Sequence, residues 1–143
     1  MKKFILAVFL SFVFFGCAKD SVKKENIALN NGFENRSFTI YKVILNGKEL
    51  DIKKLQENPN ITFENNKFYG FSGCNRFFGV YSIKNGSLKI EGDRVASTQM
   101  LCHPLEIMDF ENAFLSNFNG EFSVNYNSSN FVLENKIMQI YFK

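Results

Sequence analysis

The chain has 143 residues, of which 17 are lysine or arginine and 14 are aspartate or glutamate, so its formal net charge is +3 at neutral pH. Nucleic-acid-binding domains carry concentrated basic faces, whereas the arginines here, Arg36, Arg76 and Arg94, are far apart, so the composition excludes nucleic acid as a partner. The length is enough for one domain.

The N-terminus has the pattern of a secretory signal peptide. Lys2 and Lys3 precede an apolar run at residues 4–15, which is about half of the roughly 20 residues that a membrane-spanning helix needs. The Gly16-Cys17 pair that follows resembles the lipobox of bacterial lipoproteins, in which the cysteine thiol is acylated and the chain is cut before it. We therefore expect a signal peptide at residues 1–16 and lipidation at Cys17.

A lipidated Cys17 predicts the location of the protein. A lipidated Cys17 would carry three acyl chains, two in a diacylglyceryl group and one palmitate-type chain on its amino group. Lasting membrane attachment needs only two membrane-binding signals. Ala18, rather than aspartate, follows the cysteine, which in enteric bacteria favours the outer membrane. We expect a lipid-anchored envelope protein that faces the periplasm, with residues 17–35 as a flexible tether. The alternatives are a plain signal peptide with a chance cysteine and an uncleaved anchor.

The tether is followed by a segment that alternates short β-forming runs with turn signals, and we expect one domain at residues 36–143. Asn46-Gly47 is a strong hairpin signal, and residues 51–58 have the pattern of one or two helical turns that end before Pro59. Strands are predicted at residues 37–45, 48–51, 61–64, 67–72, 79–83, 87–91, 94–101, 121–126, 131–134 and 136–142.

Residues 104–118 are different, because their apolar positions recur at helical spacing. Ile107, Phe110, Phe114 and Phe118 lie three or four residues apart, which predicts an amphipathic helix. Pro104 is suited to the first helical turn, and acidic residues near the N-terminus favour the helix dipole.

These elements predict an α+β fold. Hairpin connections require antiparallel pairing, and one amphipathic helix cannot cover both faces of a flat sheet. We therefore expect a strongly curved antiparallel sheet, a partial barrel, with the one helix packed against it.

Two segments form the most specific pattern in the chain. They are Gly73-Cys74-Asn75-Arg76-Phe77-Phe78-Gly79-Val80-Tyr81 and Ala96-Ser97-Thr98-Gln99-Met100-Leu101-Cys102. Together they resemble the META domain family, which includes the HslJ-like heat-shock proteins of bacteria. The chain departs from the family pattern at Phe38, where a tryptophan is usual, and at His103, an extra residue before the proline.

The resemblance implies a curved antiparallel sheet with a packed helix, in an envelope protein linked to stress tolerance. It implies no catalytic residue and no cofactor. We therefore expect a non-enzymatic binding or interaction module, with an unidentified envelope protein as its partner. The alternative is a carrier that holds an apolar ligand or a lipid between sheet and helix.

The remaining cysteines, Cys74 and Cys102, would lie in an oxidising compartment, which favours a disulfide. Closing this loop would stabilise the fold by roughly 3–4 kcal/mol. Two buried free thiols are the alternative. A nucleophilic site formed by Cys102 and His103 is disfavoured, because neighbouring residues on a strand point to opposite faces. A metal site is disfavoured because the chain lacks the CxxC or HxxxH spacing of metal ligands.

The other motif residues are predicted to be structural. Gly73, Asn75 and Gly79 are interpreted as positions where the backbone takes a positive φ. Arg76 is expected to be solvated or in a structural ion pair. The aromatic run Phe77-Phe78 and Tyr81 is expected in the core, and any part of it that is exposed could line an apolar groove.

Overall fold

The computed structural model describes residues 32, 34–127 and 130–143. The predicted signal peptide, the lipidation site Cys17 and nearly all of the predicted tether lie outside the described residues. Within the described ranges, no helix combines the length and the apolar character needed to cross a bilayer.

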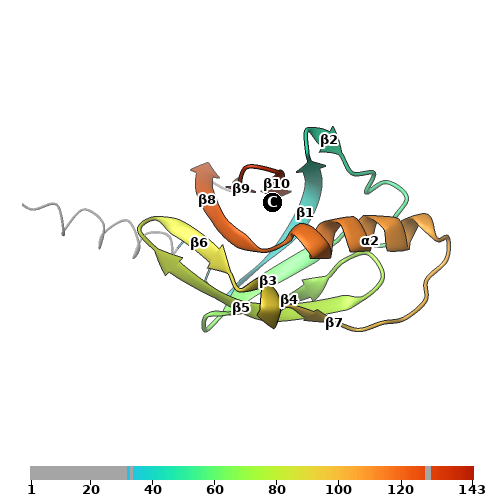
Figure 1. The fold of residues 1–143 in the computed structure, drawn as a ribbon, viewed down its shortest axis with the longest axis horizontal. Helices are drawn as coiled ribbons and strands as arrows, with labels where there is room; N and C mark the ends of the chain where they lie inside the picture. The colour runs from blue at the N-terminus through green and yellow to red at the C-terminus, as the bar shows by residue number, and fades with distance from the viewer. Residues whose placement is uncertain (1–31, 33, 128–129) are drawn as a thin grey trace, which may run out of the picture.

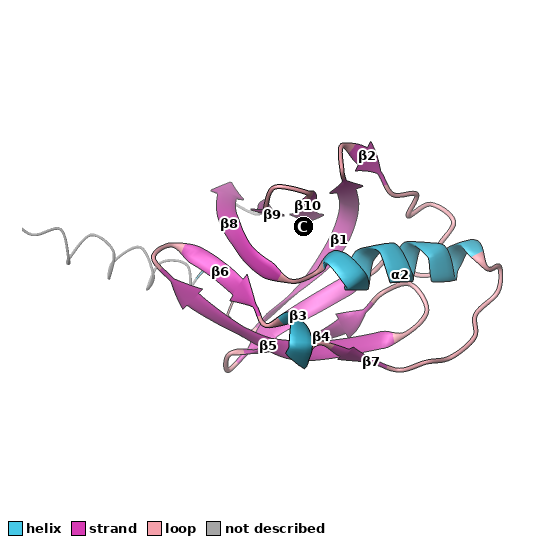
Figure 2. Ribbon diagram, in the orientation of Figure 1, coloured by secondary structure: helices cyan, strands magenta, loops and turns pink. Residues whose placement is uncertain are grey.

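The described part of the chain contains ten strands, one α-helix and one short 3-10 helix (Figures 1 and 2). In chain order these are β1 (Arg36–Leu45), β2 (Lys48–Glu49), β3 (Asn60–Glu64), β4 (Lys67–Phe71), β5 (Arg76–Lys84), β6 (Ser87–Ile90), η1 (Gly92–Arg94), β7 (Ala96–Ser97), α2 (Glu106–Asn117), β8 (Gly120–Asn127), β9 (Asn130–Glu134) and β10 (Met138–Phe142).

The strands form one antiparallel sheet in the order β10-β9-β8-β6-β5-β4-β3-β1-β2, and β10 also pairs with β1. This last pairing closes eight strands into a ring, while β2 and β7 add short edges to β1 and β5. The expectation of an α+β fold with a curved antiparallel sheet is confirmed, but the barrel is closed rather than partial.

The barrel closes because β1 is long enough to serve two neighbours. Its first residues pair with β3 from Arg36 to Thr39, and its later residues pair with β10 from Ile40 to Leu45. A register shift between Ile40 and Lys42 bends the strand at this point, as β-bulges do. Sequence periodicity predicted the strand but not its second partner.

Phenylalanine rings fill the space between the sheet and α2. Phe118 of the helix C-terminus lies 5.3 Å from Phe68 on β4 and 6.1 Å from Phe77 on β5, measured between ring centroids. The predicted helical stripe is confirmed, because Ile107, Phe110, Phe114 and Phe118 are all buried. Packing of this kind gives the interior its stability and leaves it closely filled.

Two segments differ from the sequence prediction. Residues 51–58 form turns and bends without a helix. Leu50 and Ile52, two residues apart, both pack against the core, and a helix would turn positions two apart to different faces. Of the strand predicted at residues 94–101, only Ala96–Ser97 pairs with β5. The Thr98 N–H still donates to the Arg76 carbonyl at 2.9 Å. After Thr98 the chain leaves the sheet, and the Asn75 side chain binds the backbone of Met100.

Candidate functional site

The two motif segments meet at the end of β4, where the β4–β5 turn, the chain after β7 and α2 come together. The polar cluster at this junction consists of Ser72, Asn75, Thr98 and Glu111. Ser72 and Asn75 are fully buried and Glu111 is 4% exposed. Buried polar groups of this kind are costly unless each has a hydrogen-bond partner.

Asn75 uses both ends of its amide to bind the chain after β7. Its Oδ1 accepts hydrogen bonds from Thr98 Oγ1 at 2.8 Å and from the Met100 N–H at 2.7 Å. Its Nδ2 donates to the Met100 carbonyl at 3.1 Å and to Glu111 Oε1 at 2.7 Å. One side chain therefore connects both motif segments to the helix.

Glu111 completes the polar cluster from α2. Its Oε2 accepts from the Asn75 N–H at 2.7 Å and from the Ser72 hydroxyl. Thr98 extends the connection, because its Oγ1 accepts from the Arg76 N–H at 3.1 Å. Every buried side-chain nitrogen and oxygen in the described residues has a partner. Such a cluster is suited to holding three chain segments in a fixed arrangement.

A disulfide between Cys74 and Cys102 lies beside the polar cluster. The two Cα atoms are 6.1 Å apart, within the usual range for such a bridge. The structure thus contains the expected disulfide rather than two free thiols, and neither sulfur is available as a thiolate nucleophile. In the described ranges, no group of three or more histidine, cysteine, aspartate or glutamate side chains is arranged to hold a metal ion.

A positive φ was predicted at Gly73, Asn75 and Gly79, and the prediction is right for Gly73 and wrong for the other two. Gly73 has a φ of 97°, a conformation that favours glycine. Asn75 and Gly79 are not among the described residues with positive φ. Asn75 is instead required for its side chain. Gly79 is required for space, because a Cβ there would lie 2.4 Å from the Phe68 ring.

The polar cluster and the disulfide fix an exposed apolar loop, residues 99–105. Met100, Leu101 and Leu105 are 58%, 73% and 57% exposed. Figure 1 shows this connection from β7 to α2 at the right end of the molecule. Gln56 donates a hydrogen bond to the His103 carbonyl at 3.2 Å, which connects the loop to residues 51–58 as well. Exposed apolar side chains on a fixed segment are typical of a contact surface.

A second carboxylate acts at the other end of β4. Glu34 lies just before β1, bridges to Phe63, and accepts hydrogen bonds from the Asn65 N–H in the β3–β4 turn and from the Tyr81 hydroxyl. Tyr81 is 3% exposed. Burial raises the pKa of Tyr81 above its ordinary value, and the hydrogen bond to Glu34 and its charge raise it further.

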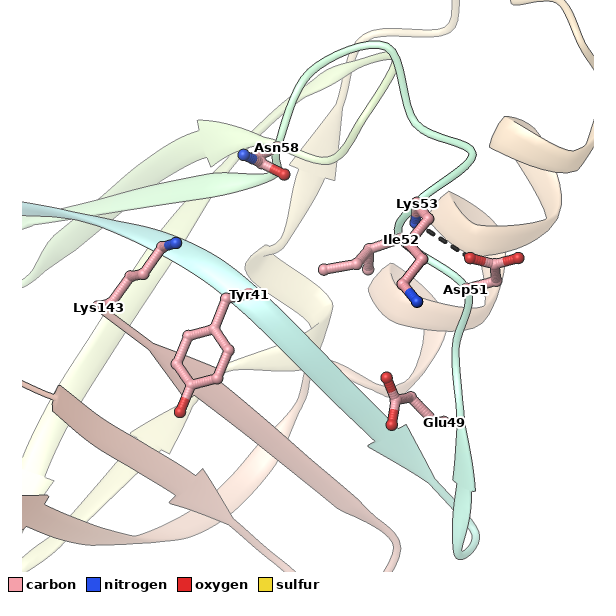
Figure 3. Close-up of a pocket in the computed structure, with 7 residues that line it drawn as sticks. All are labelled: Tyr41, Glu49, Asp51, Ile52, Lys53, Asn58 and Lys143. Atoms are coloured by element: carbon pink, nitrogen blue, oxygen red, sulfur yellow. Dashed lines mark hydrogen bonds between the residues drawn. The ribbon is translucent and has the colours of Figure 1, made fainter.

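A cleft of about 570 Å³ lies between β1 and residues 51–58 (Figure 3). We call it the Tyr41 cleft. Its lining combines one aromatic ring, one aliphatic side chain and several polar groups. These residues are Tyr41, Glu49, Asp51, Ile52, Lys53, Asn58 and Lys143. The volume is in the range of small-molecule sites.

The structure brings most of the predicted motif residues together. Gly73, Asn75, Thr98 and Met100 lie at the junction, and Phe77 and Tyr81 point into the core as expected. The expectation is wrong for Phe78, which is 53% exposed because neighbouring residues on β5 point to opposite faces of the sheet. The Arg76 side chain is exposed and has no ion-pair partner among the described residues. Ala96 and Ser97 contribute the β7 pairing with β5.

Sequence reasoning missed Glu111 and Glu34. A signal for Glu111 was present, because this carboxylate lies four residues after Ile107 and three before Phe114, within the apolar stripe of the helix. A charge at such a position needs a buried partner. Glu34 lies in a polar run with no periodicity, so nothing in the sequence distinguished it from its neighbours.

A family model and a relative of known sequence assign this chain to the same family. The META domain family model matches residues 31–142. The chain is 31% identical over 113 residues to the heat shock protein HslJ of Escherichia coli (strain K12), an alignment that covers 78% of this chain and 74% of HslJ.

Two structures determined by NMR share the fold. A protein from Burkholderia xenovorans superposes with a TM-score of 0.65 at 17% identity, covering 99% of this chain and 97% of its own. A second protein superposes with a TM-score of 0.56 at 24% identity, covering 76% of this chain and 88% of its own. At these identities the superpositions support the closed barrel with one helix and nothing about activity.

Proposed function

The chain belongs to the META domain family, and on this premise we propose that it is a lipid-anchored protein of the bacterial envelope that binds another envelope protein during stress. The link to stress comes from the heat shock protein HslJ, to which the chain is similar. The observation that carries the binding role is the use of the family motif. The buried polar side chain of the motif, Asn75, is engaged in fixing the exposed apolar loop.

The construction of the apolar loop supports binding. Asn75 holds Met100 by its N–H and its carbonyl, and the disulfide holds Cys102 two residues later. Met100 and Leu101 therefore protrude from a backbone that is already fixed. Binding through such a loop loses little conformational entropy, which favours affinity. The same contacts support the proposal of a non-enzymatic role, because the two inner cysteines are joined and the buried polar groups of the described residues are satisfied.

The placement of the loop supports a protein partner over the membrane that carries the anchor. The N-terminal segment joins the domain where Glu34 binds the β3–β4 turn, whereas the loop is held at the β4–β5 turn, at the other end of β4. Five strand residues separate these turns, a length of roughly 17 Å. The apolar side chains thus lie away from the point where the tether enters.

The alternative of an apolar-ligand carrier has less support. A carrier needs a cavity between sheet and helix, and the rings of Phe68, Phe77, Phe114 and Phe118 occupy that space with neighbouring centroids 5.2–6.1 Å apart. A ligand of useful size would have to displace this packing.

Lipid attachment is tested with Cys17→Ala in the full chain expressed in a bacterium. We expect loss of radiolabelled palmitate incorporation and release of the protein from the membrane fraction, because the thiol is the site of acylation. Cys102→Ala serves as the control and should keep the label. Unchanged labelling and membrane retention of Cys17→Ala would exclude the lipoprotein role.

The docking role is tested with Leu101→Asp in the same expression system. We expect the substitution to remove the products formed by chemical crosslinking in intact envelopes, because a charge in the contact excludes the apolar partner surface. Ile137→Asp is the matched control, since Ile137 is 43% exposed in the β9–β10 turn, on another part of the surface. Equal crosslinking of both variants and the parent would contradict a contact at the loop.

A further inference from the structure

We propose that the Tyr41 cleft binds a small organic anion that carries a ring, at a site separate from the apolar loop. The cleft is about 570 Å³ in volume and lies between β1 and residues 51–58 (Figure 3). This inference stands on the cleft itself and does not depend on lipid attachment or on a protein partner.

The lining carries two carboxylates and two ammonium groups, and they differ in their ion-pair partners. Of its two carboxylates, Glu49 pairs with Lys42 at 3.6 Å and Asp51 pairs with Lys54 at 4.0 Å, and neither lysine lines the cleft. Asp51 also accepts a hydrogen bond from the Lys53 N–H at 3.0 Å. The acidic groups are therefore partly neutralised by residues outside the cleft.

The two ammonium groups that line the cleft are in the opposite situation. Neither Lys53 nor Lys143 has a carboxylate within ion-pair distance among the described residues. Lys143 lies over the Tyr41 ring, with its Nζ 6.0 Å from the ring centroid. Asn58 adds an exposed amide to the same cleft. A carboxylate or phosphate is the group that such donors recognise.

Tyr41 and Ile52 provide the apolar part of the site. Tyr41 is 38% exposed and its position is fixed, since its ring meets Tyr141 edge-on at a centroid distance of 6.0 Å. It lies at the register shift between Ile40 and Lys42, and β-bulges of this kind redirect side chains and are common beside binding sites. A ring-bearing ligand can therefore place its flat face against Tyr41 while its anion reaches the lysines.

The wall opposite Tyr41 is held in place although it has no regular secondary structure. Leu50, Ile52 and Leu55 pack against the core, so residues 51–58 follow the barrel surface. The Leu50 N–H donates to the Val43 carbonyl at 2.9 Å, which fixes the start of the wall to β1. The cleft is thus largely formed before a ligand arrives, as in most small-molecule sites.

The test uses the full-length chain in a non-ionic detergent, with NMR titration of benzoate, phenyl phosphate and the neutral analogue benzyl alcohol. We expect benzoate and phenyl phosphate to shift the backbone amide resonances of Tyr41, Ile52, Lys53 and Lys143 in a saturable way. Benzyl alcohol should bind at least tenfold more weakly, because it has the ring without the charge. The tighter of the two anions shows whether the site prefers a carboxylate or a phosphate.

The charge variants separate a specific site from general attraction. Lys53→Met/Lys143→Met should weaken binding of the better anion at least tenfold. Lys67→Met/Lys89→Met has the same net charge, removes lysines outside the cleft and should bind as the parent does. The proposal is overturned if neither anion gives saturable shifts at the cleft, if benzyl alcohol binds equally well, or if both double variants behave alike.

Discussion

Glu111 and Glu34 act at opposite ends of β4, and comparing them shows how burial determines the contribution of a carboxylate to stability. Each accepts hydrogen bonds from a backbone N–H in a turn and from a side-chain hydroxyl. Glu111 also binds the Asn75 amide and is 4% exposed, whereas Glu34 is only half-buried. The two ends therefore share a chemistry and differ in access to water.

The difference predicts unequal costs of substitution. A donor that loses its partner in the interior keeps its full desolvation penalty, while a donor near the surface can bind water instead. Removal of Glu111 should therefore disrupt its end of the barrel, and removal of Glu34 should loosen only the entry of the N-terminal segment.

The largest effect is expected for Glu111→Ala. It leaves the Asn75 backbone N–H and one N–H of the Asn75 amide without their acceptor, while the Ser72 hydroxyl keeps the Asn75 carbonyl at 2.8 Å. At ~1–3 kcal/mol for each of the two buried donors, the loss should be about 4 kcal/mol. Urea unfolding followed by circular dichroism measures it. Glu106→Ala, on the exposed first turn of the same helix, is the control. A loss no larger than that of the control would mean that the polar cluster does not stabilise the fold.

The disulfide comes next. Replacing both cysteines by alanine releases a covalent connection over 28 residues, and the chain-entropy model gives a loss of about 3.5 kcal/mol. Because the hydrogen bonds of Asn75 remain, the fold should persist with a lower midpoint in urea. The comparison with Glu111→Ala would be reversed if the cysteine variant were the less stable of the two.

Gly79 pairs with Phe68 on β4, between the two ends compared above. This motif residue is required because it has no side chain. Gly79→Ala places a Cβ 2.4 Å from the buried Phe68 ring and 3.0 Å from the Arg94 carbonyl, so we expect a loss of about 2 kcal/mol from overpacking. Gly47→Ala is the contrast, because its φ is 77° and no atom lies within 4 Å of the added Cβ. Its cost should be about 1 kcal/mol from backbone strain alone. Equal losses would argue against the packing explanation.

Sequence reasoning was most successful where a residue acts through periodicity. The helical stripe of Ile107, Phe110, Phe114 and Phe118 was visible as spacing, and all four side chains are buried as predicted. The hairpin at Asn46-Gly47 was visible as turn chemistry, and both residues have positive φ. These features depend on neighbours in sequence, so a single chain reveals them.

Features that depend on distant partners could not be predicted in the same way. The closure of the barrel depends on β1 pairing with β10 at the far end of the chain, and no local pattern encodes that register. Asn75 was identified as a motif residue, but its partners lie 23 to 36 residues away, so a role in the backbone was the simplest inference. The Tyr41 cleft joins β1 to residues 51–58 and to Lys143 and has no sequence pattern at all.

The smallest effect concerns Tyr81, and it examines the Glu34 end directly. The pKa of Tyr81 lies above its ordinary value of 10.0 because burial disfavours the phenolate and because Glu34 binds the neutral hydroxyl. Glu34→Gln should lower this pKa while burial keeps it above the ordinary value. Titration of tyrosinate absorbance in the parent, in Glu34→Gln and in Tyr81→Phe identifies the contribution of this residue. The third variant is necessary because a hydrogen bond to Glu64 also raises the pKa of Tyr69.

The direction of the stability change follows from the raised pKa. As the pH rises above 10.0, the ordinary value of Tyr81, the unfolded chain loses the Tyr81 proton before the folded chain does, so the free energy of unfolding falls with pH. Below that value Tyr81 is neutral in both states and contributes no pH dependence. Because Glu34→Gln brings the folded pKa closer to the unfolded one, the decline above that pH should be smaller than in the parent. A decline of the same size in both proteins would show that Glu34 does not act on Tyr81, and that the two ends of β4 differ in more than burial.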